Sequence, residues 1–329
     1  MSTLPAWESA ILQGITFQLS PEDIEHFLQS HRSHDAAPVQ LVSDGSQKGP
    51  AMSFGWIFGT SDGTILAEHA GPAFGTPTSH RAEGWGMLSG ARFLLHLCRY
   101  RRIPLPQHLH IESVSDNAGL ITRMQNRRTY VTVFANATLE PDWDITEQIH
   151  ASFEDIQPVT HKYAWERGHQ DDTTPYHQLC QTAKYNVRAD ALANEFMQQD
   201  SKGHPLSPLL PAAKCQFIIE DYTVEGNYTN IIRRLATESD YFHFLQQKHG
   251  WTCSVTADVD CPPLDLQPIS TQPPTIISSK WYIIYFQLAS TNPASRNTST
   301  LYATTATRLN PSTIFYDATI PSQRNFEPP

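Results

Sequence analysis

The strongest constraint on the fold is the way strand-length and helix-length segments alternate between residues 39 and 197. Short apolar runs typical of strands occur at 39–42, 54–58, 65–67, 109–114 and 159–165. Apolar residues with helical spacing occur at 81–100, 118–124, 143–156 and 185–197. Three strands, a helix, a strand, two helices, a strand and a helix predict a mixed α/β layer fold. The Asp62-Gly63 pair between two apolar runs also predicts a β-hairpin.

The segments outside this pattern predict how the chain is organised. A length of 329 residues allows two domains, or one domain with long flanks. Residues 1–37 form a helical lead-in, in which Ser20 and Pro21 are a typical helix start. The domain itself spans 38–200, and a small segment with a strand at 217–219, a helix at 230–247 and an extended stretch at 251–259 is appended over 201–261. The tail, 262–329, has ten prolines and eighteen Ser/Thr, which predicts poor order apart from one strand at 281–288.

Charge, cysteine content and apolar runs exclude several classes of protein. Lys and Arg number 23 against 33 Asp and Glu, a net charge of −10, so a broad basic nucleic-acid surface is not expected. Any contact with nucleic acid must then be local or assisted by metal ions. The five cysteines never occur as CxxC, which favours reduced thiols. The start lacks the features of a secretory signal, and the best apolar run, 281–288, is far shorter than the ~20 residues of a membrane helix. We therefore expect an intracellular protein without a membrane partner.

Acidic residues occupy the ends of predicted strands and the faces of predicted helices. Asp44 and Asp116 each end a strand, Glu83 lies in the first turn of the long helix, and Asp190 lies on the last helix. Residues at strand ends lie on the rim of a sheet, where a neighbouring helix can bring further carboxylates to the same point. Clustered carboxylates repel one another unless cations neutralise them, which favours Mg²⁺ or Mn²⁺. Two such ions about 3.5–4 Å apart can activate a water molecule and stabilise the leaving oxygen of a phosphodiester.

Five short motifs in a fixed order carry a resemblance to a known family. They are DGS at 44–46, SHRAE at 79–83, SDN at 115–117, GHQ at 168–170 and NVRADALA at 186–193. This order resembles the type 1 ribonuclease H domain, closest to the version in reverse-transcriptase-bearing retroelements, over about residues 38–200.

The resemblance implies a ribonuclease H-like fold, a five-stranded mixed sheet with helices on both faces. It implies hydrolysis of the RNA strand of an RNA–DNA hybrid, with two Mg²⁺ or Mn²⁺ ions as cofactors. Carried over by motif, the metal-binding acids are Asp44, Glu83, Asp116 and Asp190, and His169 is a mobile proton-transfer residue. It further implies that the chain derives from a retroelement polyprotein, with a reverse transcriptase domain as a possible partner.

Several polar residues near these motifs are candidates for substrate contacts: Ser79, Asn117, Arg123, Arg127, Arg128 and Asn186. Ser79 and Asn117 could contact the hybrid backbone or a 2′-hydroxyl, the group that distinguishes RNA from DNA. Equally, they could be turn and cap residues. The three arginines are candidates for phosphate contacts.

Each acid also has an ordinary structural explanation when taken alone. An Asp before Gly-Ser is commonly a turn residue, and Glu83 suits a helix N-terminus because of the helix dipole. Two rival functions therefore stay open. One is a catalytically inactive ribonuclease H-like module with a structural or tethering role, which would bind no Mg²⁺ or Mn²⁺. The other is a DNA-cutting relative of the same fold, which usually has three acids and lacks the SHRAE and GHQ motifs.

Overall fold

The structure is a computed structural model. It describes residues 4–30, 38–101, 109–130, 140–156, 160–200, 202–204, 206–213, 215–219, 222–226, 284–288 and 300–302. The predicted helix at 230–247 and extended stretch at 251–259 lie outside these residues. So does most of the tail whose poor order was predicted.

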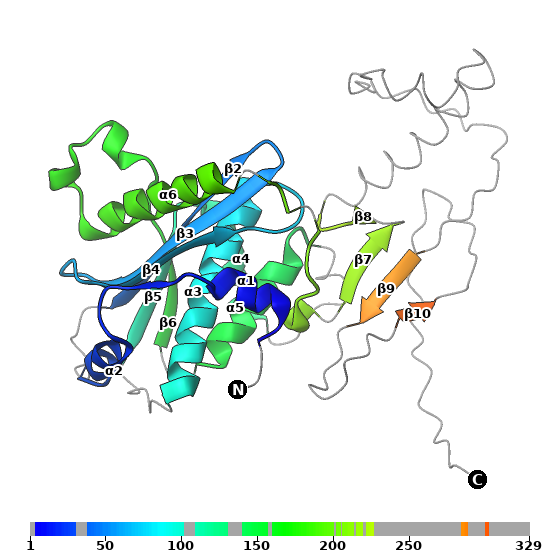
Figure 1. Cartoon of the computed structure of the whole chain (residues 1–329), viewed down its shortest axis with the longest axis horizontal. Coiled ribbons are helices and arrows are strands. Elements are labelled where there is room, and N and C mark those ends of the chain that lie inside the picture. Colours follow the sequence, from blue (N-terminus) through cyan, green and yellow to red (C-terminus); the bar gives the residue numbers. More distant parts are fainter. Residues whose placement is uncertain are drawn as a thin grey trace, which may run out of the picture.

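A six-stranded mixed sheet forms the centre of the described chain, in the order β1-β4-β3-β2-β5-β6 (Figure 1). Three long strands pair antiparallel: β2 (Val39–Lys48), β3 (Ala51–Thr60) and β4 (Ile65–Pro72). Strands β5 (His110–Ser115) and β6 (Thr160–Trp165) continue parallel to β2. The β3–β4 hairpin turns at the predicted Asp62-Gly63, where Gly63 has φ +100°. The five strands expected from the sequence are therefore confirmed.

The sixth strand comes from the lead-in and was not predicted. The lead-in consists of α1 (Ala6–Leu12), β1 (Thr16–Phe17) and α2 (Pro21–Ser30). Strand β1 has only two residues and pairs antiparallel with the edge of β4. The Ser20 hydroxyl accepts a hydrogen bond from the Asp23 backbone N–H at 3.1 Å, the cap that the sequence indicated.

Helices cover both faces of the sheet, as predicted. On one face lies α6 (Gln181–Gln199), whose Tyr185 and Ala189 pack on Val42, Ile57 and Val114 (Figure 1). On the other face lie α3 (Ser79–Arg101) and α5 (Trp143–Glu154), with α4 (Ala118–Thr129) beside them. The larger core fills the space between α3 and the sheet, around Trp56, Phe58, Trp85 and Leu88. The sheet is therefore held between two layers of helices.

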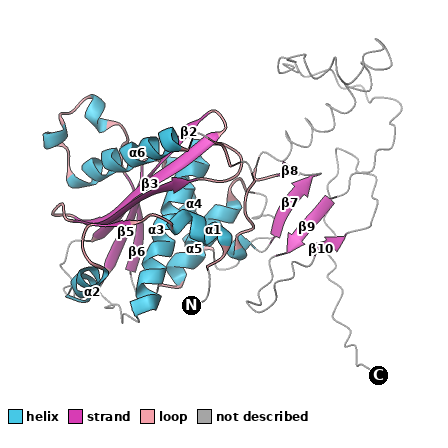
Figure 2. Ribbon diagram, in the orientation of Figure 1, coloured by secondary structure: helices cyan, strands magenta, loops and turns pink. Residues whose placement is uncertain are grey.

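The segment after α6 contributes a short helix and a second, smaller sheet. The 3₁₀ helix η4 (Pro211–Ala213) is followed by β7 (Cys215–Ile219), which overlaps the predicted strand at 217–219. The second sheet has the order β10-β9-β7-β8, with β8 (Tyr222–Thr223), β9 (Ile284–Leu288) and β10 (Thr300–Tyr302) (Figure 2). Strand β9 lies within the predicted strand at 281–288. No helix of the described ranges is long and apolar enough to span a membrane.

We expect the buried His69 to make a contribution to stability that is lost in acid. His69 on β4 is 3% exposed, and its Nε2–H donates to the Ile11 carbonyl at 3.0 Å. Burial lowers the pKa of His69 from 6.5 to about 4. Between these values the unfolded chain binds a proton at His69 that the folded chain does not, so the contribution of His69 to stability falls as pH decreases from about 6.5 to about 4. We expect a loss of roughly 2–3 kcal/mol.

Urea denaturation at several pH values checks this expectation. His69→Gln keeps an N–H donor but cannot titrate, so its stability should lack this loss relative to the wild type as pH decreases over this interval. An equally steep dependence in the variant would contradict the role given to His69.

Candidate metal centre

Asp44 lies within β2, beside the start of α3, and β2 continues to Lys48, so the prediction that Asp44 ends its strand was wrong. Its side chain is buried, and its Oδ1 accepts a hydrogen bond from the Gly45 N–H at 2.7 Å. Asn186 of α6 donates from Nδ2 to Asp44 Oδ2 at 3.3 Å. A β-carbon on Gly45 would lie 2.6 Å from the Ala82 carbonyl carbon and closer still to the Glu83 nitrogen. Glycine at 45 thus allows β2 and α3 to approach closely enough for Asp44 and Glu83 to meet.

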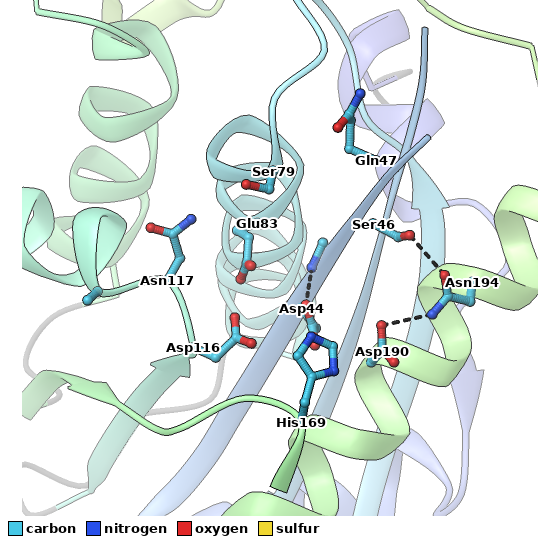
Figure 3. A pocket seen from close by; sticks show the side chains of 12 residues that line it. Asp44, Ser46, Gln47, Ser79, Glu83, Asp116, Asn117, His169, Asp190 and Asn194 are labelled. Carbon is cyan, nitrogen blue, oxygen red and sulfur yellow. Dashed lines mark hydrogen bonds between the residues drawn. The ribbon is translucent and has the colours of Figure 1, made fainter. Parts of the chain in front are cut away.

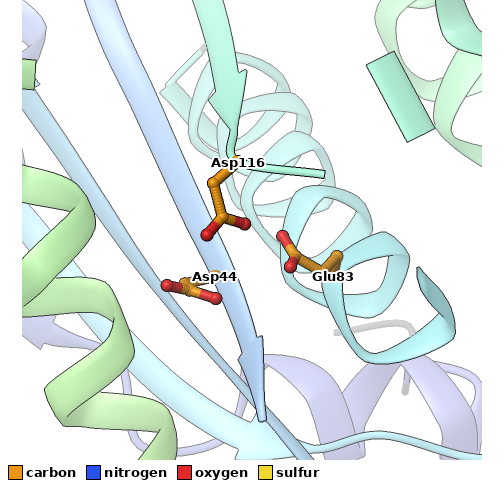
Figure 4. Close-up of side chains that lie close together, drawn as sticks. All are labelled: Asp44, Glu83 and Asp116. Atoms are coloured by element: carbon orange, nitrogen blue, oxygen red, sulfur yellow. The ribbon is translucent and has the colours of Figure 1, made fainter. Parts of the chain in front are cut away.

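Three of the predicted metal ligands converge at this point. Asp44, Glu83 and Asp116 each offer a carboxylate oxygen, and these oxygens all lie within 4.8 Å of one another (Figure 4). Asp116 follows the end of β5, beside Asp44, because β5 pairs in parallel with β2. Glu83 is held by Ser115, whose hydroxyl donates to Glu83 Oε2 at 2.6 Å. The three carboxylates therefore come from a strand, a helix and a strand end that the fold brings together.

The electrostatics of the cluster favour a bound cation. Burial, followed by the charges of Asp116 and Asp190, raises the pKa of Asp44 to about 8. Burial, then Asp44 and Asp116, raises the pKa of Glu83 well above its usual value. The carboxylates of Asp44, Glu83 and Asp116 therefore repel one another, and the cluster contains no basic side chain that would neutralise them. All-oxygen ligand sets of this kind suit Mg²⁺ or Mn²⁺, so the residues fit the predicted ions.

A pocket opens at the cluster and is lined by most of the predicted site residues (Figure 3). It is lined by Asp44, Gly45, Ser46, Gln47, Ser79, Glu83, Asp116, Asn117, Ala118, His169, Asp190 and Asn194. All four predicted metal ligands, together with His169, therefore line one cavity. Asp190 approaches from α6, and burial raises its pKa although the charge of His169 opposes the shift.

His169 stands on an exposed loop after β6 and takes a left-handed backbone conformation, with φ 49° and ψ 38°. This conformation is uncommon for a residue other than glycine. The preceding Gly168 lies directly on Asp116: a β-carbon there would be 3.0 Å from Asp116 Cγ and nearer to Oδ2. The loop therefore passes close to the acid cluster, with the imidazole at the mouth of the pocket.

The candidate substrate residues divide into two groups. Ser79 and Asn117 line the pocket, although the Asn117 side chain also caps α4 by accepting from the Leu120 N–H at 3.0 Å. Asn186 is buried, does not line the pocket and donates to Asp44, so its predicted substrate contact stays a prediction that this burial does not favour.

The three arginines do not line the pocket. Arg127 is mostly buried, and its guanidinium binds Glu147 at 2.5 and 2.9 Å. Arg123 donates to the Pro141 carbonyl, and Arg128 to the His161 carbonyl at 2.8 Å. Because each arginine already binds another part of the protein, these contacts do not favour the predicted binding to phosphates, which stays a prediction. The case is weakest for Arg127.

Sequence reasoning missed Asn194, which lies one helical turn after Asp190. Its Nδ2 donates to Asp190 Oδ1 at 2.8 Å, and its Oδ1 accepts from the Ser46 hydroxyl at 2.9 Å. Asn194 thereby links the DGS motif to the last helix. The i, i+4 spacing from Asp190 is the signal that could have identified it.

Comparisons with known proteins found similar solved structures. No family model matches the chain, and no curated protein matches it. The N-terminal ribonuclease H domain of a Mycobacterium tuberculosis protein is 20% identical with a TM-score of 0.33, covering 50% of this chain and 96% of that one. The ribonuclease H1 named LC11, in complex with an RNA/DNA hybrid, is 16% identical with a TM-score of 0.35, covering 50% and 99%.

A foamy viral protease–reverse transcriptase, also in complex with an RNA/DNA hybrid, is 14% identical with a TM-score of 0.35. That match covers 50% of this chain and 20% of the viral one. This chain is therefore similar, over about half its length, to ribonuclease H domains that include a retroviral one.

Proposed function

We propose that this protein is a metal-dependent endonuclease that hydrolyses the RNA strand of RNA–DNA hybrids. The observation that carries the proposal is the convergence of Asp44, Glu83 and Asp116 within 4.8 Å, in a pocket that Asp190 and His169 also line. Four acids and a histidine from five separated motifs meet at one place. If each acid served only as a turn or cap residue, this convergence would not be expected.

The residues present divide the chemistry among them. Asp44, Glu83, Asp116 and Asp190 would hold two Mg²⁺ or Mn²⁺ ions, which supply an activated water and stabilise charge on the phosphodiester. Asn186 and Ser115 orient Asp44 and Glu83 from behind. The His169 imidazole, exposed at the mouth of the pocket, transfers a proton to or from the reacting oxygen.

Selection of the RNA strand requires contact with 2′-hydroxyls across the shallow minor groove. Ser79 and Asn117 line the pocket beside Glu83 and Asp116, where they can make such contacts. A net charge of −10 and an arginine set engaged in packing imply few phosphate contacts. We therefore expect weak affinity that depends little on salt. On duplex DNA each neutralised phosphate steepens the fall of log affinity with log salt concentration by about 0.9, and few phosphates are neutralised here.

The five motifs are closest to those of retroelements. On that ground we propose that the chain derives from a retroelement polyprotein, acts inside the cell and can work beside a reverse transcriptase domain. A reverse transcriptase would supply the hybrid and contribute the affinity that this acidic chain lacks.

Parallel digestion of a matched hybrid, RNA duplex and DNA duplex tests the proposed activity. We expect cleavage of the hybrid's RNA strand with Mg²⁺ or Mn²⁺ at low salt, and none after chelation. Equal cutting of the DNA duplex would favour the DNA-cutting relative. No cleavage together with no binding of Mg²⁺ or Mn²⁺ would favour the inactive module.

His169→Ala should slow cleavage by about 10²–10⁴-fold, as expected for a lost proton-transfer group. Since the side chain is exposed, folding should be unaffected. Single-turnover rates at saturating Mn²⁺ measure the effect, with His177→Ala, in the same connection to α6 but absent from the pocket lining, as the matched control. Equal rates in the two variants would remove His169 from the mechanism.

A further inference from the structure

The first turn of α3 contains a buried arginine that lies two residues before Glu83. Arg81 is 0% exposed, and its Nε donates to the Phe74 carbonyl at 2.6 Å. Its guanidinium also binds Asp142 at 3.0 Å and Asp144 at 2.8 Å, from the start of α5. An arginine stays charged in a protein, so a buried one needs every donor paired.

Two further partners of Arg81 come from the segment that follows α6. Nη2 donates to the Ser207 hydroxyl and lies 3.1 Å from Glu225 Oε1. Glu225 is itself 8% exposed, and its Oε2 accepts from the Thr76 N–H at 2.6 Å. Its backbone carbonyl accepts from the Asp142 N–H at 2.7 Å. Glu225 thus joins the loop before α3 to the loop before α5.

The rest of this segment packs against the same region. Leu210 and Ala213 are buried in the main core, and the Ala212 N–H donates to Gln148 of α5 at 3.0 Å. The His204 carbonyl accepts from the Gly75 N–H at 2.8 Å. Gly75 has φ +98°, and a β-carbon there would overlap the Glu225 carboxylate. His204, Ser207 and Glu225 therefore contact the beginning of α3 and the loop before it.

The start of α3 presents Ser79 and Glu83 to the pocket, while Arg81 between them points into this buried cluster. Anchoring Arg81 therefore fixes the helical turn from which Glu83 reaches the other two acids. We propose that Glu225 and Ser207 are positioning residues for the metal centre, and that they act through Arg81. This inference rests on the proposed function. If it is correct, Ser207 and Glu225, which follow α6, support the geometry of the nuclease site.

The test compares Glu225→Ala in the full chain with Glu147→Ala. Glu147 is a matched control because it also pairs with a mostly buried arginine, Arg127, but lies away from the pocket. Both variants should melt at lower temperature. Only Glu225→Ala should weaken Mn²⁺ binding, by about tenfold in calorimetry, and lower kcat by about tenfold, with the KM for hybrid within about twofold of the wild type.

A conservative variant and a milder one keep the test decisive. Glu225→Gln retains an acceptor for Thr76 and should recover part of the Mn²⁺ affinity. If Glu225→Ala does not fold, Ser207→Ala should still lower Mn²⁺ affinity and kcat by about threefold. Unchanged Mn²⁺ affinity and kcat in the folded variants, with only a lower melting temperature, would overturn the inference and leave the proposed function intact. A wild type that neither binds Mn²⁺ nor cleaves hybrid would overturn both.

Discussion

Asp44→Asn is expected to abolish hybrid cleavage and, at the same time, to stabilise the metal-free protein. Asp44 lies at the centre of the acid cluster, within reach of Glu83 and Asp116. Loss of its charge removes a ligand, and metal stabilisation supplies several kcal/mol of the transition state. We therefore expect cleavage to fall by about 10³-fold or more.

The gain in stability follows from the raised pKa of Asp44. A carboxyl whose folded pKa is about 8, against 3.8 unfolded, binds its proton more tightly in the folded state. Its ionisation therefore destabilises the metal-free fold increasingly as pH rises from about 4 to 8. Asparagine removes this cost while keeping an oxygen that can accept from the Gly45 N–H. We expect the free energy of unfolding to increase by roughly 1–3 kcal/mol at pH 7.

Cleavage rates and urea denaturation with metal chelated measure the two effects on the same samples. Asp116→Asn should lose cleavage in the same way. Asp62→Asn is the matched control, because Asp62 lies exposed in the β3–β4 turn and its carboxylate accepts from the Thr64 N–H. That variant should keep full activity without any gain in stability. An active or destabilised Asp44→Asn protein would contradict the assignment of Asp44 as a ligand in a repulsive cluster.

Gly45→Ala should destabilise the fold severely and destroy the site with it. The added β-carbon would meet the backbone of Ala82 and Glu83, which cannot rotate away as a flexible side chain could. Strand β2 and helix α3 would have to separate. Overpacking in a core typically lowers the free energy of unfolding by about 1–3 kcal/mol. Because this clash is with backbone atoms, we expect a loss of about 3 kcal/mol or more.

Gly86→Ala provides the comparison on the same helix against the same sheet. A β-carbon at 86 would lie 3.2 Å from the β-carbons of Phe54 and Ser43, which can shift by a few tenths of an ångström. We expect its stability to stay within about 1 kcal/mol of the wild type. Denaturation curves for both variants decide the matter. Similar stabilities would show that the close approach at Gly45 is not required.

The acids could be assigned to their strands and helices because the local pattern and the motif order define those elements, although the boundary predicted at Asp44 was wrong. Asp116 follows the end of β5, and Asp44 lies within the neighbouring parallel strand β2, which continues to Lys48. Glu83 and Asp190 lie on helices that must cover the two faces. Apolar periodicity and motif order were enough to place these residues on their elements.

Contacts between distant, irregular segments could not be predicted in this way. Glu225 lies in a stretch without helical or strand periodicity, so nothing local indicates that it reaches Arg81. Strand β1 has only two residues, too few to show a period. The pattern of α4 places Arg127 on a helix but does not identify the neighbouring helix α5, where Glu147 binds it. The sequence therefore predicted the types of most elements but not which elements pack against one another.

Calorimetric titration of the metal-free protein with Mn²⁺ tests the central claim most directly. The four acids and their pocket predict that the wild type binds two ions, and that Asp44→Asn greatly weakens this binding while Asp62→Asn leaves it unchanged. Absence of Mn²⁺ binding by the wild type, or equal binding by Asp44→Asn, would contradict the claim that this cluster is a metal centre.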